Sequence, residues 1–474
     1  MNSKIMFFFK NFSYTLISNL ISLVVSTLVV LVIPKLIGVE EYGYWQLYLF
    51  YSAYVGFLHF GWNDGIYLRY GGERYKDLDK GKFFSQFYMM VIFQLALALI
   101  GFLVSDNFID DTNRIFIYKM IAINLVLFNV RSMLLFILQA TNRIKEYARI
   151  TIFDRVIYIG FILLFLLVGV REFNLLVIAD LFGKVISLIV AIVSCKEIIF
   201  MKVNVFYFDV RETFLNINAG IKLMFANISS MLIIGVIRFG IERTWDVETF
   251  GKISLTLSIS NLMMIFINSI GIIIYPALRR TENGKLVKIY CVLRDVLMVL
   301  SFGILILYYP LKQILTAWLP NYSDSLIYMS ILFPMLIYEG KTALLLNTYF
   351  KTLRKEKLML QVNLTSLVAS ILLTLLATEL FGNLNFTVTL ILVILAFRAI
   401  FAEYMLSKII NISIKRDVTM ELLMTIVFVT LGWFLNSWLS TIIYIIAYIF
   451  FIVIKLEDIR DSISVFKSLL RNEM

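Results

Sequence analysis

Long, uninterrupted apolar segments are the feature that most limits what this chain can fold into. A helix that crosses the hydrocarbon core of a bilayer needs about 20 mostly apolar residues. About fourteen such segments follow one another along the 474 residues, of which 61% are hydrophobic and 16% charged. A soluble domain could not bury so much apolar surface, and barrel strands would alternate in polarity instead. We therefore predict an all-α polytopic membrane protein.

The approximate limits of the predicted spans can be read directly from the sequence. The first seven are 13–33, 44–63, 83–104, 115–139, 151–169, 175–194 and 222–239. The other seven are 250–276, 294–310, 325–345, 359–378, 387–407, 421–436 and 440–456. The first segment is longer than a signal-peptide core and has no small-residue cleavage site after it. We expect it to remain in place as the first helix.

The basic residues predict the orientation of these spans. With fourteen helices both termini lie on the same side, and about 29 Lys and Arg residues then fall in the loops on that side, against 5 on the other. Cytoplasmic loops are enriched in Lys and Arg, so both termini are expected in the cytoplasm. This bias also accounts for the net charge of +11 without any bound nucleic acid.

The loops and the tail predict how the chain is organised. We expect an N-terminal six-helix lobe at 1–194, a cytoplasmic interfacial linker at 195–221 and a C-terminal six-helix lobe at 222–407. Two additional transmembrane helices occupy 408–456. In the remaining stretch, 457–474, the apolar residues recur at helical spacing, which predicts an amphipathic helix on the cytoplasmic surface.

Several classes of function are excluded by composition. Cys195 and Cys291 form neither a disulfide framework nor a zinc spacing. His59 is the single histidine, which excludes most histidine-based catalysis and metal binding. We expect no cofactor, no metal and no enzymatic activity. His59 itself is read as a packed side chain more readily than as a proton relay.

Four cations are placed deep inside the predicted spans. Ionisable groups at membrane depth are costly and normally face a protein interior or a water-filled cavity. Arg131 and Lys184 lie in the fourth and sixth spans, and Lys341 and Arg398 lie in the tenth and twelfth. If the two lobes are repeats, the four positions correspond in pairs. They are candidates for binding an anion such as a diphosphate, although Arg131 and Lys341 could instead extend to lipid phosphates.

Acidic groups within or next to the spans are candidates for ion coupling or gating. Asp180 precedes Lys184 by four residues on one helix face, so it either neutralises that lysine or couples H⁺ or Na⁺ movement to transport. Glu339 and Glu403 are candidates of the same kind, closer to the cytoplasm. Asp64 follows the second span and is either a helix cap or a gating contact. For all four, a structural role is the simpler interpretation.

Motifs near the N-terminus resemble a known family. The sequence IPKLIG at 33–38 leads to EYG at 41–43, and a glycine-rich segment follows at 61–72. This pattern is similar to that of Wzx-type polysaccharide flippases, in the multidrug/oligosaccharidyl-lipid/polysaccharide (MOP) transporter superfamily. The motifs cover about 70 residues, while the helix number, the inside termini and the short loops agree over the whole chain.

The resemblance carries implications that composition alone does not. It implies two six-helix bundles around a central V-shaped cavity, with two additional C-terminal helices. It also implies a substrate, polyprenyl-diphosphate-linked oligosaccharide, moved from the cytoplasmic to the outer leaflet of a bacterial plasma membrane by alternating access. Membrane lipids and other polysaccharide assembly proteins are the expected partners. A cationic cavity and an ion gradient belong to the same implication.

Two other functions are alternatives to this one. An exporter of drugs or cations from the same superfamily should place acidic groups at mid-membrane, whereas the cations stand out here. A membrane polymerase or ligase should carry a large outer loop with catalytic residues, but the predicted outer loops are only about 5–15 residues long. The flippase is therefore the favoured prediction, with the cation-coupled exporter of small molecules as the alternative.

Overall fold

The computed structural model describes residues 3–108, 110–279, 283–435, 438–458 and 460. Over these residues the protein is helical without any strand, and ten helices are long and apolar enough to cross a bilayer. Two shorter apolar helices lie at Leu20–Leu36 and Trp438–Ile454. The prediction of an all-α polytopic membrane protein is confirmed.

The chain divides into two compact units. Unit 1 is Met1–Ile228 and unit 2 is Ser229–Met474. The division falls within one long helix, α9 (Val210–Thr244), so this helix contributes its first half to unit 1 and its second half to unit 2. The predicted interfacial linker at 195–221 is therefore helical from Val210 onward.

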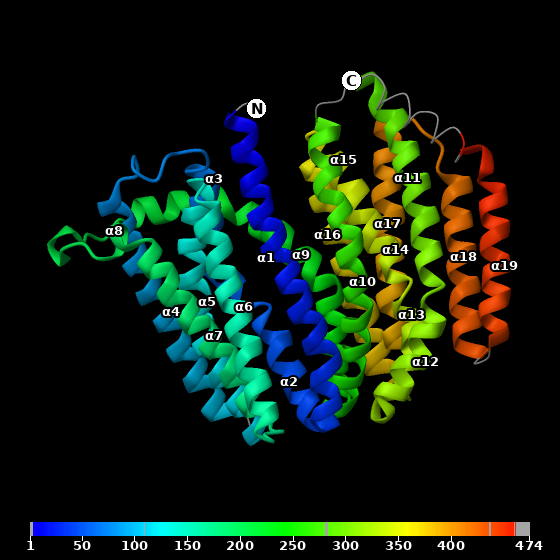
Figure 1. The fold of residues 1–474 in the computed structure, drawn as a ribbon, viewed down its shortest axis with the longest axis horizontal. Helices are drawn as coiled ribbons and strands as arrows, with labels where there is room; N and C mark the ends of the chain where they lie inside the picture. Colours follow the sequence, from blue (N-terminus) through cyan, green and yellow to red (C-terminus); the bar gives the residue numbers. More distant parts are fainter. Residues whose placement is uncertain (1–2, 109, 280–282, 436–437, 459, 461–474) are drawn as a thin grey trace. The chain divides into compact units, whose positions relative to one another are not determined.

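Unit 1 contains the helices from α1 to α8 and the first half of α9. The long helices are α1 (Ser3–Leu36), α4 (Lys80–Phe108), α5 (Thr112–Ala140), α6 (Ile144–Leu167) and α7 (Phe173–Ser194). The pairs α4–α5, α5–α7 and α6–α7 lie side by side, and α1 packs on α6 (Figure 1). Asp111 caps α5 by accepting hydrogen bonds from the N–H groups of Asn113 and Arg114.

The second predicted span is broken into three short helical pieces. They are α2 (Val39–Ser52), a 3₁₀ turn at Val55–His59, and α3 (Trp62–Arg69). Phe60 and Gly61 both have positive φ angles, 53° and 82°, so the chain cannot continue as one helix there. The prediction of one continuous helix over 44–63 was therefore wrong.

Close backbone packing joins α3 to the first part of α9. A Cβ atom on Gly65 would lie 1.8 Å from the carbonyl oxygen of Asn216, and one on Gly220 would lie 2.0 Å from the carbonyl oxygen of Gly61. Only glycine permits this approach. A short segment follows α7, formed by α8 (Lys196–Ile199) and a turn at Val203–Val205, with Val203 and Phe208 exposed.

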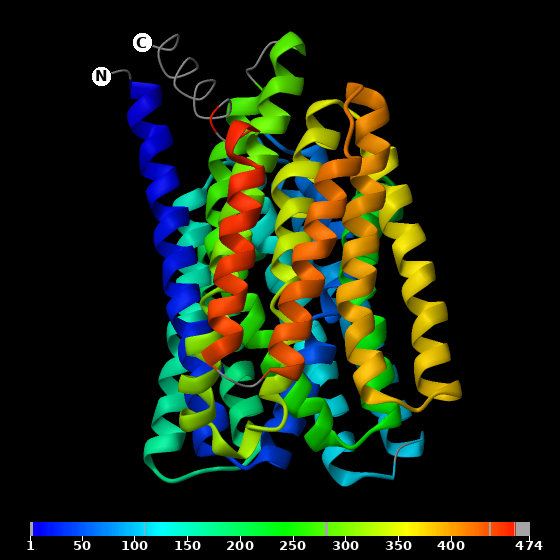
Figure 2. The same cartoon turned by 90° about the vertical axis from the view of Figure 1, so that its right-hand side faces the viewer.

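Unit 2 contains the second half of α9 and the helices that follow it. Its longer helices are α10 (Val247–Arg279), α11 (Asn283–Leu305), α12 (Tyr308–Trp318), α16 (Glu356–Leu375), α17 (Leu384–Ile410), α18 (Lys415–Phe434) and α19 (Trp438–Ile454). The helices α18 and α19 lie side by side and pack on α11 (Figure 2). They correspond to the two additional helices predicted after 408.

The tenth predicted span forms the buried centre of unit 2. It consists of α13 (Met329–Leu332), α14 (Met335–Gly340), a π-helical turn at Lys341–Leu346 and α15 (Asn347–Thr352). Pro334 interrupts the first part, as expected for a residue without a backbone N–H. The π-helical turn begins at Lys341, and such turns occur frequently at functional sites.

Two sequence predictions about the organisation of the chain stay predictions. The amphipathic helix expected at 457–474 lies largely outside the described residues. The five-part division into lobes, linker, extra helices and tail stays a prediction, although the change of unit at Ser229 falls close to its boundary at 222.

Candidate functional site: buried ion pairs in the membrane helices

The first predicted cation, Arg131, is paired with a carboxylate inside unit 1. Arg131 on α5 lies 2.9 Å from the Asp154 carboxylate on α6 and donates a hydrogen bond to the Ser187 hydroxyl on α7. Its exposed fraction is 7%. The structure therefore places this cation between three helices, neutralised by a residue 23 positions away in the chain. It does not extend to solvent as the lipid-contact alternative required.

Lys184 and Asp180 form the second pair in unit 1. Their Nζ and Oδ2 atoms lie 2.5 Å apart on one face of α7, as the spacing of four residues predicted. The Tyr48 hydroxyl on α2 donates a second hydrogen bond to Asp180 at 2.6 Å. The carboxylate is thus held from two helices, and Tyr48 was not anticipated from the sequence.

Asp64 lies beside His59 at the break in the second span. Their side chains are 3.6 Å apart, and His59 Nδ1 accepts a hydrogen bond from the Gly61 N–H. Both side chains are buried. The break in the second span therefore brings a carboxylate and the single histidine together away from solvent.

In unit 2, Arg398 is enclosed by polar groups from several helices. Its guanidinium lies 3.1 Å from the Glu339 carboxylate on α14 and donates hydrogen bonds to Asn363 on α16 and Ser230 on α9. Arg398 is 2% exposed. The sequence predicted Arg398 and Glu339 separately, and the structure brings them together.

Lys341 is the most deeply buried of the four cations and has two carboxylate partners. Its Nζ lies 2.5 Å from Glu403 on α17 and 2.6 Å from Glu421 on α18. The Tyr290 hydroxyl on α11 also donates to Glu403, at 2.9 Å. All three charged side chains are at most 2% exposed. One lysine therefore faces two carboxylates in a region without solvent.

A second group of buried charges continues this cluster. Arg294 on α11 lies 2.8 Å from Asp417 on α18, and Lys455 after α19 binds both Asp417 and Asp295. Tyr290 connects the two groups, because the Arg294 guanidinium lies 5.9 Å from the centre of its ring. We call these seven charged residues the unit 2 network: Lys341, Glu403, Glu421, Arg294, Asp295, Asp417 and Lys455.

The unit 2 network has more carboxylates than cations. It contains three cations and four carboxylates, and none of the seven is more than 7% exposed. Asp458 also approaches Lys455, but it is partly exposed and already pairs with Arg416. An uncompensated buried charge costs several kcal/mol. The network is therefore balanced when it holds one additional positive charge, such as a proton.

Sequence reasoning missed four of these acidic residues and the lysine that pairs with two of them. Asp154, Asp295, Asp417, Glu421 and Lys455 all lie near the ends of predicted spans, where exposure to the membrane surface is the usual expectation. A signal was present for Glu421, because the span predicted to begin at 421 places a carboxylate at its first residue.

Charged side chains also fix the start of α9 within unit 1. Arg69, at the end of α3, lies 2.7 Å from Glu212, and the Tyr70 hydroxyl donates to the same carboxylate at 2.5 Å. The Trp62 indole donates to Gln86 on α4, whose amide donates to the carbonyl of Asp209. These contacts hold the segment that leads from unit 1 into unit 2.

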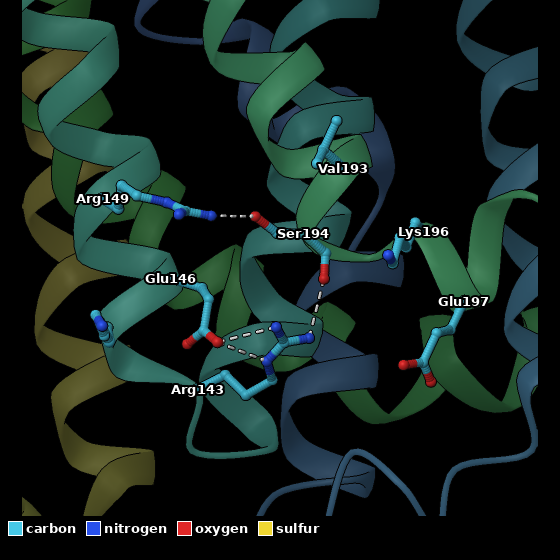
Figure 3. Close-up of a pocket in the computed structure, with 8 residues that line it drawn as sticks. Arg143, Glu146, Arg149, Val193, Ser194, Lys196 and Glu197 are labelled. Atoms are coloured by element: carbon cyan, nitrogen blue, oxygen red, sulfur yellow. Dashed lines mark hydrogen bonds and ion pairs between the residues drawn. The ribbon is translucent and has the colours of Figure 1, made fainter.

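A basic pocket of about 270 Å³ lies where α6 begins and α7 ends (Figure 3). Arg143 is held there by Glu146 at 2.9 Å and by the carbonyl oxygen of Ser194 at 3.0 Å. Arg149 donates to the Ser194 hydroxyl. By the distribution of Lys and Arg, this end of the helices is the one predicted to face the cytoplasm.

Comparison with known proteins finds a similar fold among solved structures. No family model matches the chain, and no curated protein matches it. Among solved structures, lipid II flippase MurJ in an inward closed conformation matches with a TM-score of 0.65 and 14% identity, covering 95% of this chain and 99% of that one. A multidrug resistance MATE family transporter of the MOP superfamily, in an inward-facing conformation, matches with 0.63 and 10% identity, covering 81% and 92%.

The chain has the fold of the MOP-superfamily transporters. The superfamily resemblance predicted from the sequence is thereby supported at the level of the fold, whereas the Wzx subfamily remains a prediction. The four cationic residues and four acidic residues predicted as functional also remain predictions, now with known neighbours.

Proposed function

We propose that the protein is a flippase that moves polyprenyl-diphosphate-linked oligosaccharide repeat units from the cytoplasmic to the outer leaflet of a bacterial plasma membrane. The product would supply the synthesis of O-antigen, capsule or exopolysaccharide. The observation that carries the proposal is the unit 2 network, with its one surplus carboxylate inside membrane-crossing helices. A buried group that gains or loses a positive charge is what an ion gradient needs to drive alternating access.

The geometry favours a proton over sodium as the coupling ion. The Lys341 Nζ lies within 2.6 Å of both Glu403 and Glu421, so it occupies the place that a metal ion would take between them. A proton needs no such space, because it resides on a carboxylate oxygen. Its arrival neutralises the surplus charge and changes the forces among α11, α14, α17, α18 and α19.

The paired cations suit a substrate that carries a diphosphate. Each of the four lies between 2.5 and 3.1 Å from a carboxylate. Phosphate oxygens accept the same charge-assisted hydrogen bonds as carboxylates, including bidentate bonds from arginine. Before a diphosphate binds, Arg398 is paired with Glu339. A bound diphosphate would take the place of that carboxylate as the partner of Arg398.

The extent of the structural match supports a lipid-linked substrate. The flippase structure covers 95% of this chain, whereas the multidrug transporter covers 81%. Both α18 and the segment after α19 contribute charges to the unit 2 network. The last two helices thus take part in the proposed coupling.

A second candidate is a proton-coupled exporter of small molecules. It is favoured by one observation: carboxylates already neutralise the four predicted cations, so these residues present no excess of positive charge to an anion. An exporter of cationic compounds would use the carboxylates rather than the cations.

Transport by the purified protein in liposomes separates the two functions. Several labelled diphosphate-linked oligosaccharides and a fluorescent cationic dye are tested in parallel, with and without an imposed pH gradient. Gradient-stimulated translocation of a lipid-linked oligosaccharide supports the flippase. Transport of the dye alone supports the exporter, and transport of neither contradicts both.

A further inference from the structure

The basic pocket at the start of α6 has a surplus of unpaired positive charge. Arg143 is neutralised by Glu146, and Glu197 is paired with Lys80 at 2.5 Å. The hydrogen bond from Lys80 holds the pKa of Glu197 below its ordinary value, so this carboxylate stays ionised and bound to Lys80. Among the described residues, no carboxylate forms an ion pair with the other three cations that line the pocket: Lys145, Arg149 and Lys196.

An exposed apolar stripe leads from this pocket along α7. Val193 is part of the pocket wall and is 57% exposed. Ile189 and Val185 precede it at intervals of four residues, which places them on the same helix face, and both are exposed. Farther along, Phe182 meets Phe161 of α6 with ring centres 5.6 Å apart. The stripe therefore runs from the basic pocket into the membrane-crossing part of the α6–α7 pair.

This combination matches the two ends of a phospholipid. Basic pockets between membrane helices on the cytoplasmic side are a general way to bind anionic lipid headgroups. The phosphate would receive hydrogen bonds from Arg149 and the two lysines, while an acyl chain lies along Val193 and Ile189. Free phosphate would use the cations but gain nothing from the apolar wall.

We propose that the pocket formed by Arg143, Lys145, Arg149, Val193 and Lys196 binds the headgroup of an anionic phospholipid from the inner leaflet. The site lies within unit 1 and uses none of the residues of the unit 2 network. It is independent of the proposed transport substrate. Its consequence is that the α6–α7 pair is anchored to anionic lipid at the cytoplasmic surface.

The test measures lipid binding by the full-length protein, without any transport assay. The purified chain is incubated with an equimolar mixture of phosphatidylglycerol and phosphatidylcholine, and retained lipid is counted by native mass spectrometry. The test variant carries Lys145→Gln, Arg149→Gln and Lys196→Gln. Arg143 is left intact because its bonds to Glu146 and Ser194 hold the helix ends together.

The matched control removes the same amount of charge from exposed residues elsewhere in unit 1. It carries Arg74→Gln, Lys76→Gln and Lys202→Gln, all on segments predicted to be cytoplasmic. Inorganic phosphate at millimolar concentration is added in a separate arm. Thermal unfolding and gel-filtration profiles confirm that both variants remain folded.

We expect the unaltered protein and the control to retain phosphatidylglycerol over phosphatidylcholine, and the test variant to lose at least about tenfold in affinity, given the attraction that each basic residue contributes at an anionic surface. Phosphate should leave the bound lipid in place. Equal losses in the test variant and the control would overturn the proposal, because general surface charge would then explain binding. Displacement by phosphate would also overturn it and assign the pocket to free phosphate.

Discussion

The buried charges of the two units are balanced in different ways. Unit 1 contains two closed pairs inside its helices, Arg131 with Asp154 and Lys184 with Asp180, each with one cation and one carboxylate. In unit 2 the pair of Arg398 and Glu339 is also closed, but the network around Lys341 has four carboxylates for three cations. A closed pair has no net charge, whereas the described residues of the unit 2 network carry one surplus negative charge.

This difference assigns different tasks to residues that look alike in the sequence. Lys184 and Lys341 are both lysines inside apolar helices, yet one has a single partner on its own helix and the other has two partners on neighbouring helices. The first arrangement is stable without any ion. The second needs a proton to be neutral, which makes it the better candidate for coupling.

The largest expected effect comes from removing the cation of the open network. Lys341→Gln should lower the free energy of unfolding by about 3–5 kcal/mol, because two buried carboxylates lose the one ion-pair partner that each has among the described residues. Unfolding in mixed micelles titrated with a denaturing detergent measures the change. Adding Glu421→Gln to this variant should restore part of the loss, since one carboxylate then remains. No restoration would mean that the loss comes from packing and not from charge.

A smaller effect is expected for a closed pair of unit 1. Asp154→Asn leaves the Ser187 hydroxyl as the hydrogen-bonding partner of Arg131 among the described residues. The change should cost about 2–3 kcal/mol because Arg131 is 7% exposed, whereas Lys341 is 1% exposed. The same unfolding titration applies. The double substitution Arg131→Met with Asp154→Leu should recover nearly all of the stability and keep the pH-gradient dependence of transport. Loss of that dependence in the double variant would place a coupling role in unit 1.

The smallest effect is expected for an exposed ion pair. Lys119 and Asp106 lie 2.6 Å apart, but their side chains are 31% and 54% exposed. Exposed pairs contribute roughly 0–1 kcal/mol, so Asp106→Asn should change the unfolding free energy by less than about 0.5 kcal/mol. A loss as large as that of Asp154→Asn would show that burial is not what separates the two classes of pair.

The sequence was sufficient to predict the helices but not their interruptions. The predicted apolar segments fall in helical regions of the structure, and ten helices among the described residues are long and apolar enough to cross a bilayer. This agreement arises because a span length is imposed by the bilayer and can be counted. The break at Phe60 and Gly61 and the π-helical turn at Lys341 depend on backbone angles and tertiary packing. Neither leaves a distinct mark in hydropathy.

The candidate site was only half predictable for a related reason. Lys184 and Asp180 are four residues apart, so their contact follows from helix geometry. Lys341 and Glu421 are 80 residues apart, and Arg131 and Asp154 are on different helices, so their pairing depends on which helices are neighbours. The sequence identified most of the buried cations and missed most of the acids that neutralise them.

The comparison of the two units is tested most directly by the pH-gradient dependence of transport in two matched variants. Glu421→Gln removes the surplus carboxylate of unit 2, and Asp180→Asn removes the carboxylate of a closed pair in unit 1. Glu356→Gln, at an exposed position in the first turn of α16, is the control. In liposomes containing the transported substrate, we expect Glu421→Gln to abolish stimulation by the gradient, while Asp180→Asn and the control retain it. Retained stimulation in Glu421→Gln, with loss in Asp180→Asn, would contradict this expectation.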